Sequence, residues 1–124
     1  MATGGLAAAE LAIMTLLWEQ GAMTARQLQE RLYGASDRSQ HGTVQRLLQR
    51  LLDKGFVQRE RARSAATFAA CVARDAYAGA QLEALAERLT GGSIAPLISH
   101  LIDNRRLSAA ELQRLRDLLD EGQA

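Results

Sequence analysis

Cationic, hydroxyl and amide side chains recur along one predicted helix, residues 39–54. Thr43, Arg46 and Arg50 lie three and four residues apart, which places them on one helical face. A guanidinium there can donate a fork of hydrogen bonds to a guanine edge, and it can also pair with a phosphate. The positions that share another face are apolar and must point into a core. They are Val44, Leu47, Leu48 and Leu51.

A basic turn follows this helix. Gly55 is the predicted helix end, and two extended runs come after it, the second over residues 66–72. Arg59, Arg61 and Arg63 crowd the turn between the runs. A cationic helix followed by a basic hairpin fits a DNA groove and its flanking phosphates. The pattern therefore predicts a recognition helix over residues 39–54 with a wing at residues 59–64.

The excess of positive charge is confined to one segment of the chain. The whole chain carries a formal net charge of +1, yet residues 36–64 hold seven basic and three acidic side chains. Residues 76–124 hold five basic and seven acidic side chains. A basic patch confined to one segment of a small protein is the expected electrostatic footprint of a nucleic-acid-binding surface.

Two further helices are predicted ahead of this segment, at residues 6–20 and 24–33. Leu11, Met14, Leu17 and Trp18 form the apolar stripe of the first helix. Thr24 with Gln27 predicts a capping box at the start of the second, and Ser39 is the predicted cap of the third. Three helices and then a hairpin is the order of a winged helix-turn-helix domain, here residues 1–73.

Residues 74–124 predict three short helices. Asp75 and Ser93 are the predicted caps of the first two, and Ser108 with Glu111 is a capping box for the third. Each helix has one apolar side, and three such helices bury too little surface to be stable alone. A homodimer would cover the stripes. The predicted dimerisation residues are Leu82, Leu85, Leu89, Leu97, Ile98, Leu101, Ile102, Leu112, Leu115 and Leu119.

The composition predicts a mostly α protein with a small β-hairpin. Hydrophobic residues make up 48% and charged residues 23% of the chain, as in ordinary soluble proteins. No apolar run reaches the length of a membrane span, so we expect a cytoplasmic protein with no membrane partner. Cys71 is the single cysteine, which excludes an internal disulfide, and its Ala-rich surroundings predict a buried side chain.

The sequence gives little support for a catalytic site or a metal site. His41 and His100 are far apart, and neither has a serine, cysteine or carboxylate arranged beside it as a triad would require. We therefore expect no catalytic residues, no metal site and no cofactor. A ligand- or metal-responsive winged-helix sensor is the alternative function. A winged helix used only for protein interaction would have a neutral outer face on the third helix, whereas Arg46 and Arg50 lie there.

Three segments of the chain resemble the penicillinase-repressor (BlaI/MecI/CopY) family of bacterial transcriptional regulators. They are ELAIMTLLWEQGAMTARQLQERL, GTVQRLLQRLLDKGFVQRER, and LTGGSIAPLISHLI with LSAAELQRLRDLLDE. The resemblance implies a dimeric winged-helix repressor that binds a palindromic operator in double-stranded DNA and dimerises through its C-terminal helices. It also implies relief of repression by proteolysis or another signal acting on the C-terminal region, with an upstream sensor protease as a partner.

The sequence departs from the family pattern in two places. No cysteine follows Cys71, so the copper-responsive mechanism of some members does not carry over. His41 and Gly42 replace an aromatic and a hydroxyl residue that often precede the Thr-Val pair. The residues predicted to contact DNA are Thr24, Arg26, Ser39, Gln40, His41, Thr43, Arg46, Arg50, Arg61 and Arg63.

Overall fold

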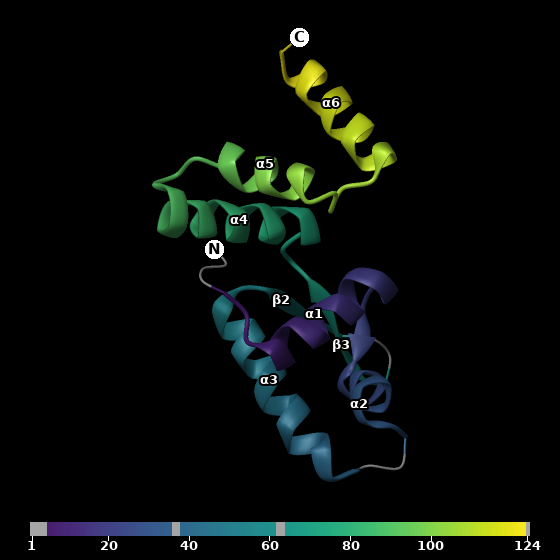
Figure 1. Cartoon of the computed structure of the whole chain (residues 1–124). Helices are drawn as coiled ribbons and strands as arrows, with labels where there is room; N and C mark the ends of the chain where they lie inside the picture. Colours follow the sequence, from purple (N-terminus) through teal and green to yellow (C-terminus); the bar gives the residue numbers. More distant parts are fainter. Residues whose placement is uncertain (1–4, 36–37, 62–63, 124) are drawn as a thin grey trace. The chain divides into compact units, whose positions relative to one another are not determined.

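The computed structural model describes residues 5–35, 38–61 and 64–123. Its residues group into two compact units, Met1–Gly79 and Ala80–Ala124 (Figure 1). The first unit contains three helices, a small sheet and the start of a fourth helix, and the described part of the second consists of helices and the turns between them. This confirms the predicted fold class, mostly α with a β-hairpin.

The three helices of the first unit are α1 (Ala8–Gln20), α2 (Ala25–Tyr33) and α3 (His41–Lys54). A short 3-10 helix, Arg38–Gln40, leads directly into α3. Gly55 takes the left-handed conformation at φ 82°, and its N–H donates to the carbonyls of Leu51 and Leu52. Gly55 therefore ends α3 as the sequence predicted, because a glycine adopts this conformation at little cost.

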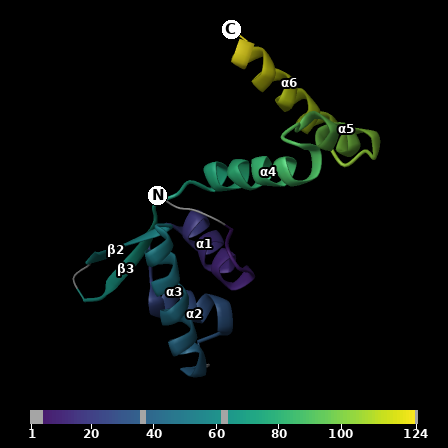
Figure 2. The same cartoon turned by 90° about the vertical axis from the view of Figure 1, so that its left-hand side faces the viewer.

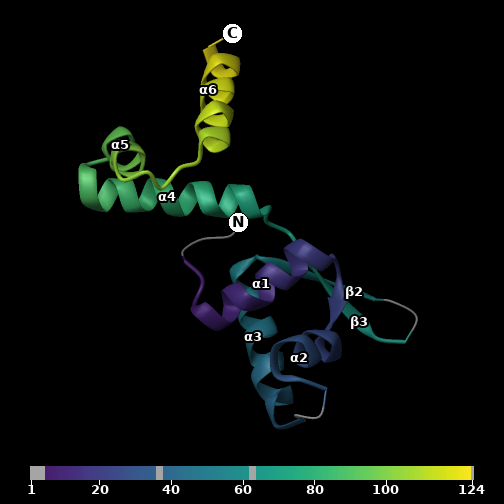
Figure 3. The ribbon, with the colours of Figure 1, turned by 45° about the vertical axis from the view of Figure 1, so that its right-hand side comes forward.

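The sheet has three antiparallel strands in the order β1-β3-β2. The predicted hairpin is formed by β2 (Val57–Arg61) and β3 (Ala66–Ala70), and it projects from the helices (Figure 3). A two-residue strand, β1 (Met23–Thr24), pairs with the other side of β3 and was not predicted. Because Met23 lies opposite Phe68, β1 ties the start of α2 to the wing.

The core of the first unit is built from the apolar stripes of all three helices and the base of the wing. Val44, Leu47, Leu48 and Leu51 are buried as predicted. In α1 the prediction was partly wrong, since Leu11 is 38% exposed, whereas Ile13 and the carboxylate residue Glu10 are buried. The other buried apolar residues here are Met14, Leu17, Met23, Leu28, Phe56, Val57 and Phe68.

Three predicted helix caps are wrong. Gln40, not Ser39, is the N-cap of α3, because the 3-10 turn carries the chain into the helix without a side-chain cap. Asp75 lies inside the first turn of α4 (Arg74–Thr90), since this helix begins earlier than predicted. Ile94 precedes α5 (Ala95–Asp103) in place of Ser93, with no side-chain cap hydrogen bond.

The capping box at the start of α2 is confirmed. The Gln27 N–H donates to Thr24 Oγ1 at 3.1 Å, and the Thr24 N–H donates to Gln27 Oε1 at 2.8 Å. The Ser108–Glu111 box is confirmed as well, with both hydrogen bonds at 3.1 Å. It opens α6 (Ala109–Gln123).

We expect Thr24→Ala to lower the free energy of unfolding by about 1 kcal/mol, the usual cost of removing a hydroxyl cap. Urea denaturation of the wild-type and variant proteins measures this difference. Thr24→Ser is the matched control, because serine keeps the acceptor for the Gln27 N–H. A Thr24→Ala protein as stable as the wild type would show that the cap contributes nothing to folding.

The first turn of α4 completes the core of the first unit. The ring of Tyr77 lies 5.6 Å from Phe56 and 6.1 Å from Trp18, measured between centroids. Its hydroxyl accepts a hydrogen bond from the Leu6 N–H at 2.9 Å. Trp18 donates from Nε1 to the Val72 carbonyl at 2.8 Å, which confirms the prediction that it is a packing residue.

The second unit leaves much of its apolar surface in solvent. Its helices α4, α5 and α6 are drawn from teal to yellow in Figure 2. Ala86 is the one buried apolar residue among those described after residue 79. Of the predicted dimerisation residues, six are exposed within the single chain: Leu82, Leu85, Leu89, Leu101, Ile102 and Leu119. Leu97, Ile98, Leu112 and Leu115 are half-buried.

Candidate nucleic-acid interface

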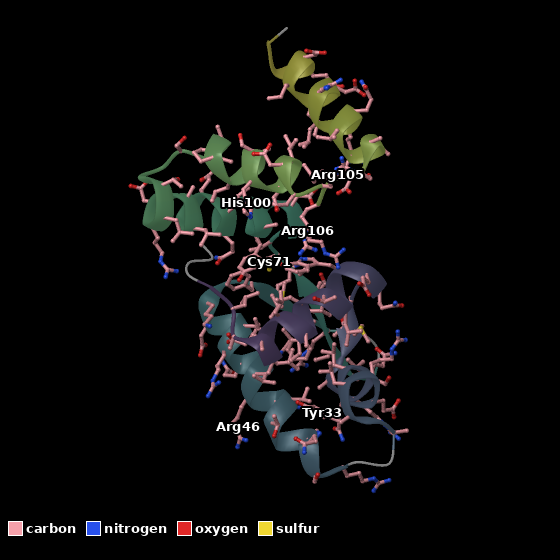
Figure 4. All side chains as sticks on the ribbon, viewed as in Figure 1. Tyr33, Arg46, Cys71, His100, Arg105 and Arg106 are labelled. Carbon is pink, nitrogen blue, oxygen red and sulfur yellow. The ribbon has the colours of Figure 1, made fainter. Side chains whose placement is uncertain are left out.

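Helix α3 separates its side chains as a groove-binding helix requires. Its apolar stripe is buried, while His41, Arg46 and Arg50 are exposed. Figure 4 shows Arg46 extending from α3 into solvent, away from α1 and α2. Thr43 is half-buried at the border between the two faces. The exposed face of α3 therefore presents two guanidinium groups and an imidazole to a binding partner.

The wing presents its arginines on one side of the hairpin. Arg59 lies opposite Phe68 and Arg61 opposite Ala66, and residues paired in this way share a face of the sheet. Phe68 is buried, so this is the face that continues into the core. The intervening residues, Gln58 and Glu60, point to the other face and hydrogen-bond each other at 3.0 Å. Because successive side chains of β2 alternate between the two faces, Glu60 lies on the opposite face from Arg59 and Arg61.

Phe68 also holds Arg59 in place. The guanidinium carbon of Arg59 lies 5.5 Å from the centre of the Phe68 ring, a cation–π contact. Since Phe68 is fixed in the core, the contact restricts the rotamers of an otherwise mobile arginine. Sequence reasoning placed Arg59 in the basic turn but did not include it among the DNA-contacting residues. The signal that identifies it is the register of the hairpin, which the sequence did not reveal.

An open cleft of about 450 Å³ brings together α2, α3 and the wing. It collects Thr24 and Arg26 from the start of α2, Gln45 from α3, and Arg59 and Arg61 from β2. Three of the predicted residues thus meet at one place, joined by Arg59 and by Gln45. Three arginines beside a helix N-terminus make a site suited to an anion, because the first N–H groups of a helix also carry partial positive charge.

A second cleft, of about 330 Å³, lies between α2 and the start of α3. Arg26, Arg38 and His41 line it together with Gln29, Glu30 and Ala35. Arg26 belongs to both clefts, and its Nε lies 3.2 Å from Glu30 Oε1. The side chain of Arg26 is 84% exposed, so this ion pair is weak and leaves Arg26 available to a phosphate.

The remaining predicted residues occupy different places. Ser39 and Gln40 belong to the 3-10 turn, next to the exposed side of the helix start. Arg50 lies a full turn beyond Arg46 on α3, outside both clefts. Arg63 lies outside the described residues.

Cys71 and His100 form no site with these residues. Cys71 is exposed, contrary to the prediction of a buried side chain, because β3 ends at Ala70 and only the backbone N–H of Cys71 still bonds to Phe56. His100 lies on α5 beside Asn104. Within the described part of the chain, no three His, Cys, Asp or Glu residues gather where they could hold a metal ion, and no helix is long and apolar enough to cross a membrane.

Three helices, a wing with arginines on one face, and a helix with an exposed cationic side define a winged helix-turn-helix DNA-binding protein. Comparison with known families agrees. The sequence model described as Penicillinase repressor matches residues 6–121, and the chain belongs to this family of DNA-binding transcriptional repressors.

Two other comparisons are less informative. The oxidised form of MarR from E. coli resembles the chain in structure at a TM-score of 0.47 and 22% identity, over 96% of this chain and 76% of MarR. No curated protein sequence matches the chain.

Proposed function

We propose that this repressor binds a palindromic operator as a homodimer, with α3 in the major groove and the wing on the adjacent backbone. The observation that supports this most directly is the cleft shared by α2, α3 and β2, where Arg26, Arg59 and Arg61 converge. In helix-turn-helix proteins the N-terminal half of the recognition helix approaches base edges. Here that half carries His41, Thr43 and Arg46.

The contacts divide into two chemical classes. Arg46 extends freely from α3 and is suited to a bidentate contact with guanine O6 and N7. Arg26, Arg59 and Arg61 border the cleft beside the start of α2 and are suited to phosphates, which position the protein without reading sequence. Ser39 and Gln40 precede α3 and would contact the backbone or base edges where the helix enters the groove.

We expect Arg61→Ala to lower the salt dependence of DNA binding by about one unit in the slope of log K against log salt concentration. Arg61 would neutralise a phosphate, and its removal leaves one fewer counterion to be released. Binding to a random duplex, measured by fluorescence anisotropy at salt concentrations from about 50 to about 200 mM, gives the slope.

Arg88→Ala is the control for this experiment, because it removes the same charge from an exposed position on α4 in the other unit. Its slope should equal that of the wild type. An unchanged slope for Arg61→Ala would remove the wing from the interface.

The C-terminal unit would join the two chains of the homodimer. Its exposed leucines and Ile102, on α4, α5 and α6, would be covered by the same helices of a second chain. A twofold dimer would place two α3 helices on half-sites separated by one helical turn or more, which accounts for a palindromic operator. A protease or another signal that loosens these helices would then release the operator without touching α3.

A further inference from the structure

A carboxylate is buried where α1 passes the end of α3. Glu10, in the first turn of α1, is 1% exposed. Its Oε1 accepts hydrogen bonds from the Ala7 N–H at 2.8 Å and from Lys54 Nζ at 2.7 Å. Lys54 is the last residue of α3, so the pair joins the two helices across 44 positions of sequence. The neighbouring ends of α1 and α3 are seen in Figures 1 and 3.

The charge of Glu10 is more than the helix cap requires. A glutamine at this position would accept from the Ala7 N–H equally well, as in other capping boxes. Burial by itself would raise the pKa of Glu10, but the hydrogen bonds from Lys54 and Ala7 and the charges of Lys54 and Arg50 outweigh it and lower the pKa. The carboxylate therefore stays ionised in the core and interacts with two cations of α3.

The pair is poorly arranged for stability alone. Glu10 Oε2 is buried and has no hydrogen-bond partner among the described residues. Only the carboxylate of the pair is buried, since the Lys54 side chain is 36% exposed. An ion pair that takes a half-satisfied carboxylate out of water is often no more stabilising than well-packed apolar side chains. What an ion pair adds is direction, because apolar attraction is non-directional, whereas the 2.7 Å hydrogen bond from Lys54 to Glu10 depends on the angle between its two groups.

We infer that Glu10 and Lys54 are positioning residues, which fix the rotation of α3 so that Arg46 and its neighbours meet the correct base edges. This inference rests on the proposed function, since it requires that α3 reads DNA. Lys54 lies two turns beyond Arg46 on the same helix, and Arg50, between them, is already within the field of Glu10. A rotation released at Lys54 would therefore displace both arginines.

The test compares sequence discrimination with stability in the full-length protein. A duplex selected by the wild type from a random-sequence pool serves as the specific probe, and a scrambled duplex of the same composition as the non-specific one. For Glu10→Gln we expect the ratio of the two affinities, at one salt concentration, to fall roughly tenfold, about the effect of one mismatched base pair. Lys54→Arg keeps the cation and should keep most of the ratio.

Two further variants separate positioning from folding. The double variant Glu10→Gln/Lys54→Met keeps the cap acceptor and leaves no buried charge unpaired, so its melting temperature should approach that of the wild type while its ratio stays low. Ile13→Val leaves a small cavity about one turn along α1 from Glu10 without altering either charge, so it should lower the melting temperature and keep the ratio.

Two outcomes would overturn the inference. If Glu10→Gln and the double variant discriminate as well as the wild type, the pair has only a structural role. If the wild type selects no duplex at all, the repressor proposal fails, and this inference fails with it.

Discussion

Arg46→Ala is expected to lower affinity for the operator by about 1–3 kcal/mol and to relax the sequence preference at one base pair. The exposed side chain of Arg46 projects from the half of α3 that we propose enters the groove, and Thr43 and Arg50 beside it on that face are polar. Without the guanidinium, guanine O6 and N7 would face an alanine methyl group, which cannot donate a hydrogen bond to them. Binding to a scrambled duplex should change far less.

The measurement is a pair of titrations, on the selected duplex and on single-base variants of it, for wild type and Arg46→Ala. The variant should bind all four bases at one position about equally. Arg114→Ala, on α6, is the matched control because it removes an exposed arginine of the other unit. Equal reductions in affinity for selected and scrambled duplexes would mean that Arg46 touches only a phosphate.

The recognition helix and the hairpin could be predicted because their signals are local. In α3 the apolar spacing, the cationic face and the terminal Gly55 all agree, and the structure buries the four predicted residues. Which face of the hairpin carries the arginines depends on the pairing of β2 with β3. The register of a hairpin depends on the length of its turn, and the sequence does not define that length here. Arg59 was therefore not among the predicted contacts.

Other features escaped prediction because their partners are distant in sequence. Acidic side chains are rarely buried without a partner, and the partner of Glu10, Lys54, lies beyond another helix, so no local pattern indicates that Glu10 is buried. Strand β1 is too short to have a periodic pattern, and it exists because β3 pairs with it. Ser39 and Ser93 were predicted as caps from residue type, but the backbone turns before α3 and α5 left them out of the cap position.

A chain ending at Gly79 is expected to be a folded monomer that binds the operator roughly 10²- to 10⁴-fold more weakly than the full-length protein. Ending the chain there, rather than at the predicted boundary after residue 73, keeps Tyr77 against Trp18 and Phe56 and so preserves the core. The two half-sites would then be bound by separate molecules. Each winged helix would lack the high effective concentration that it has when it is joined to the second one.

A full-length variant tests the same idea without removing any helix. Leu119 is 65% exposed in the single chain, so Leu119→Glu should leave the fold intact, yet in a dimer interface it would bury an unpaired charge. Ala110→Glu adds the same charge to an exposed position in the first turn of α6 and is the control. Sedimentation should show monomers for Leu119→Glu and dimers for the control.

Operator binding should follow the assembly state, since the residues that we propose contact DNA are identical in both variants. A lower affinity in Leu119→Glu, with α3 and the wing untouched, would show that the C-terminal helices act on DNA binding only by joining two chains. It would also support the proposal that a signal confined to those helices relieves repression. If the chain ending at Gly79 sediments as a dimer, or holds the operator as tightly as the full-length protein, the exposed stripes of α4, α5 and α6 serve another partner.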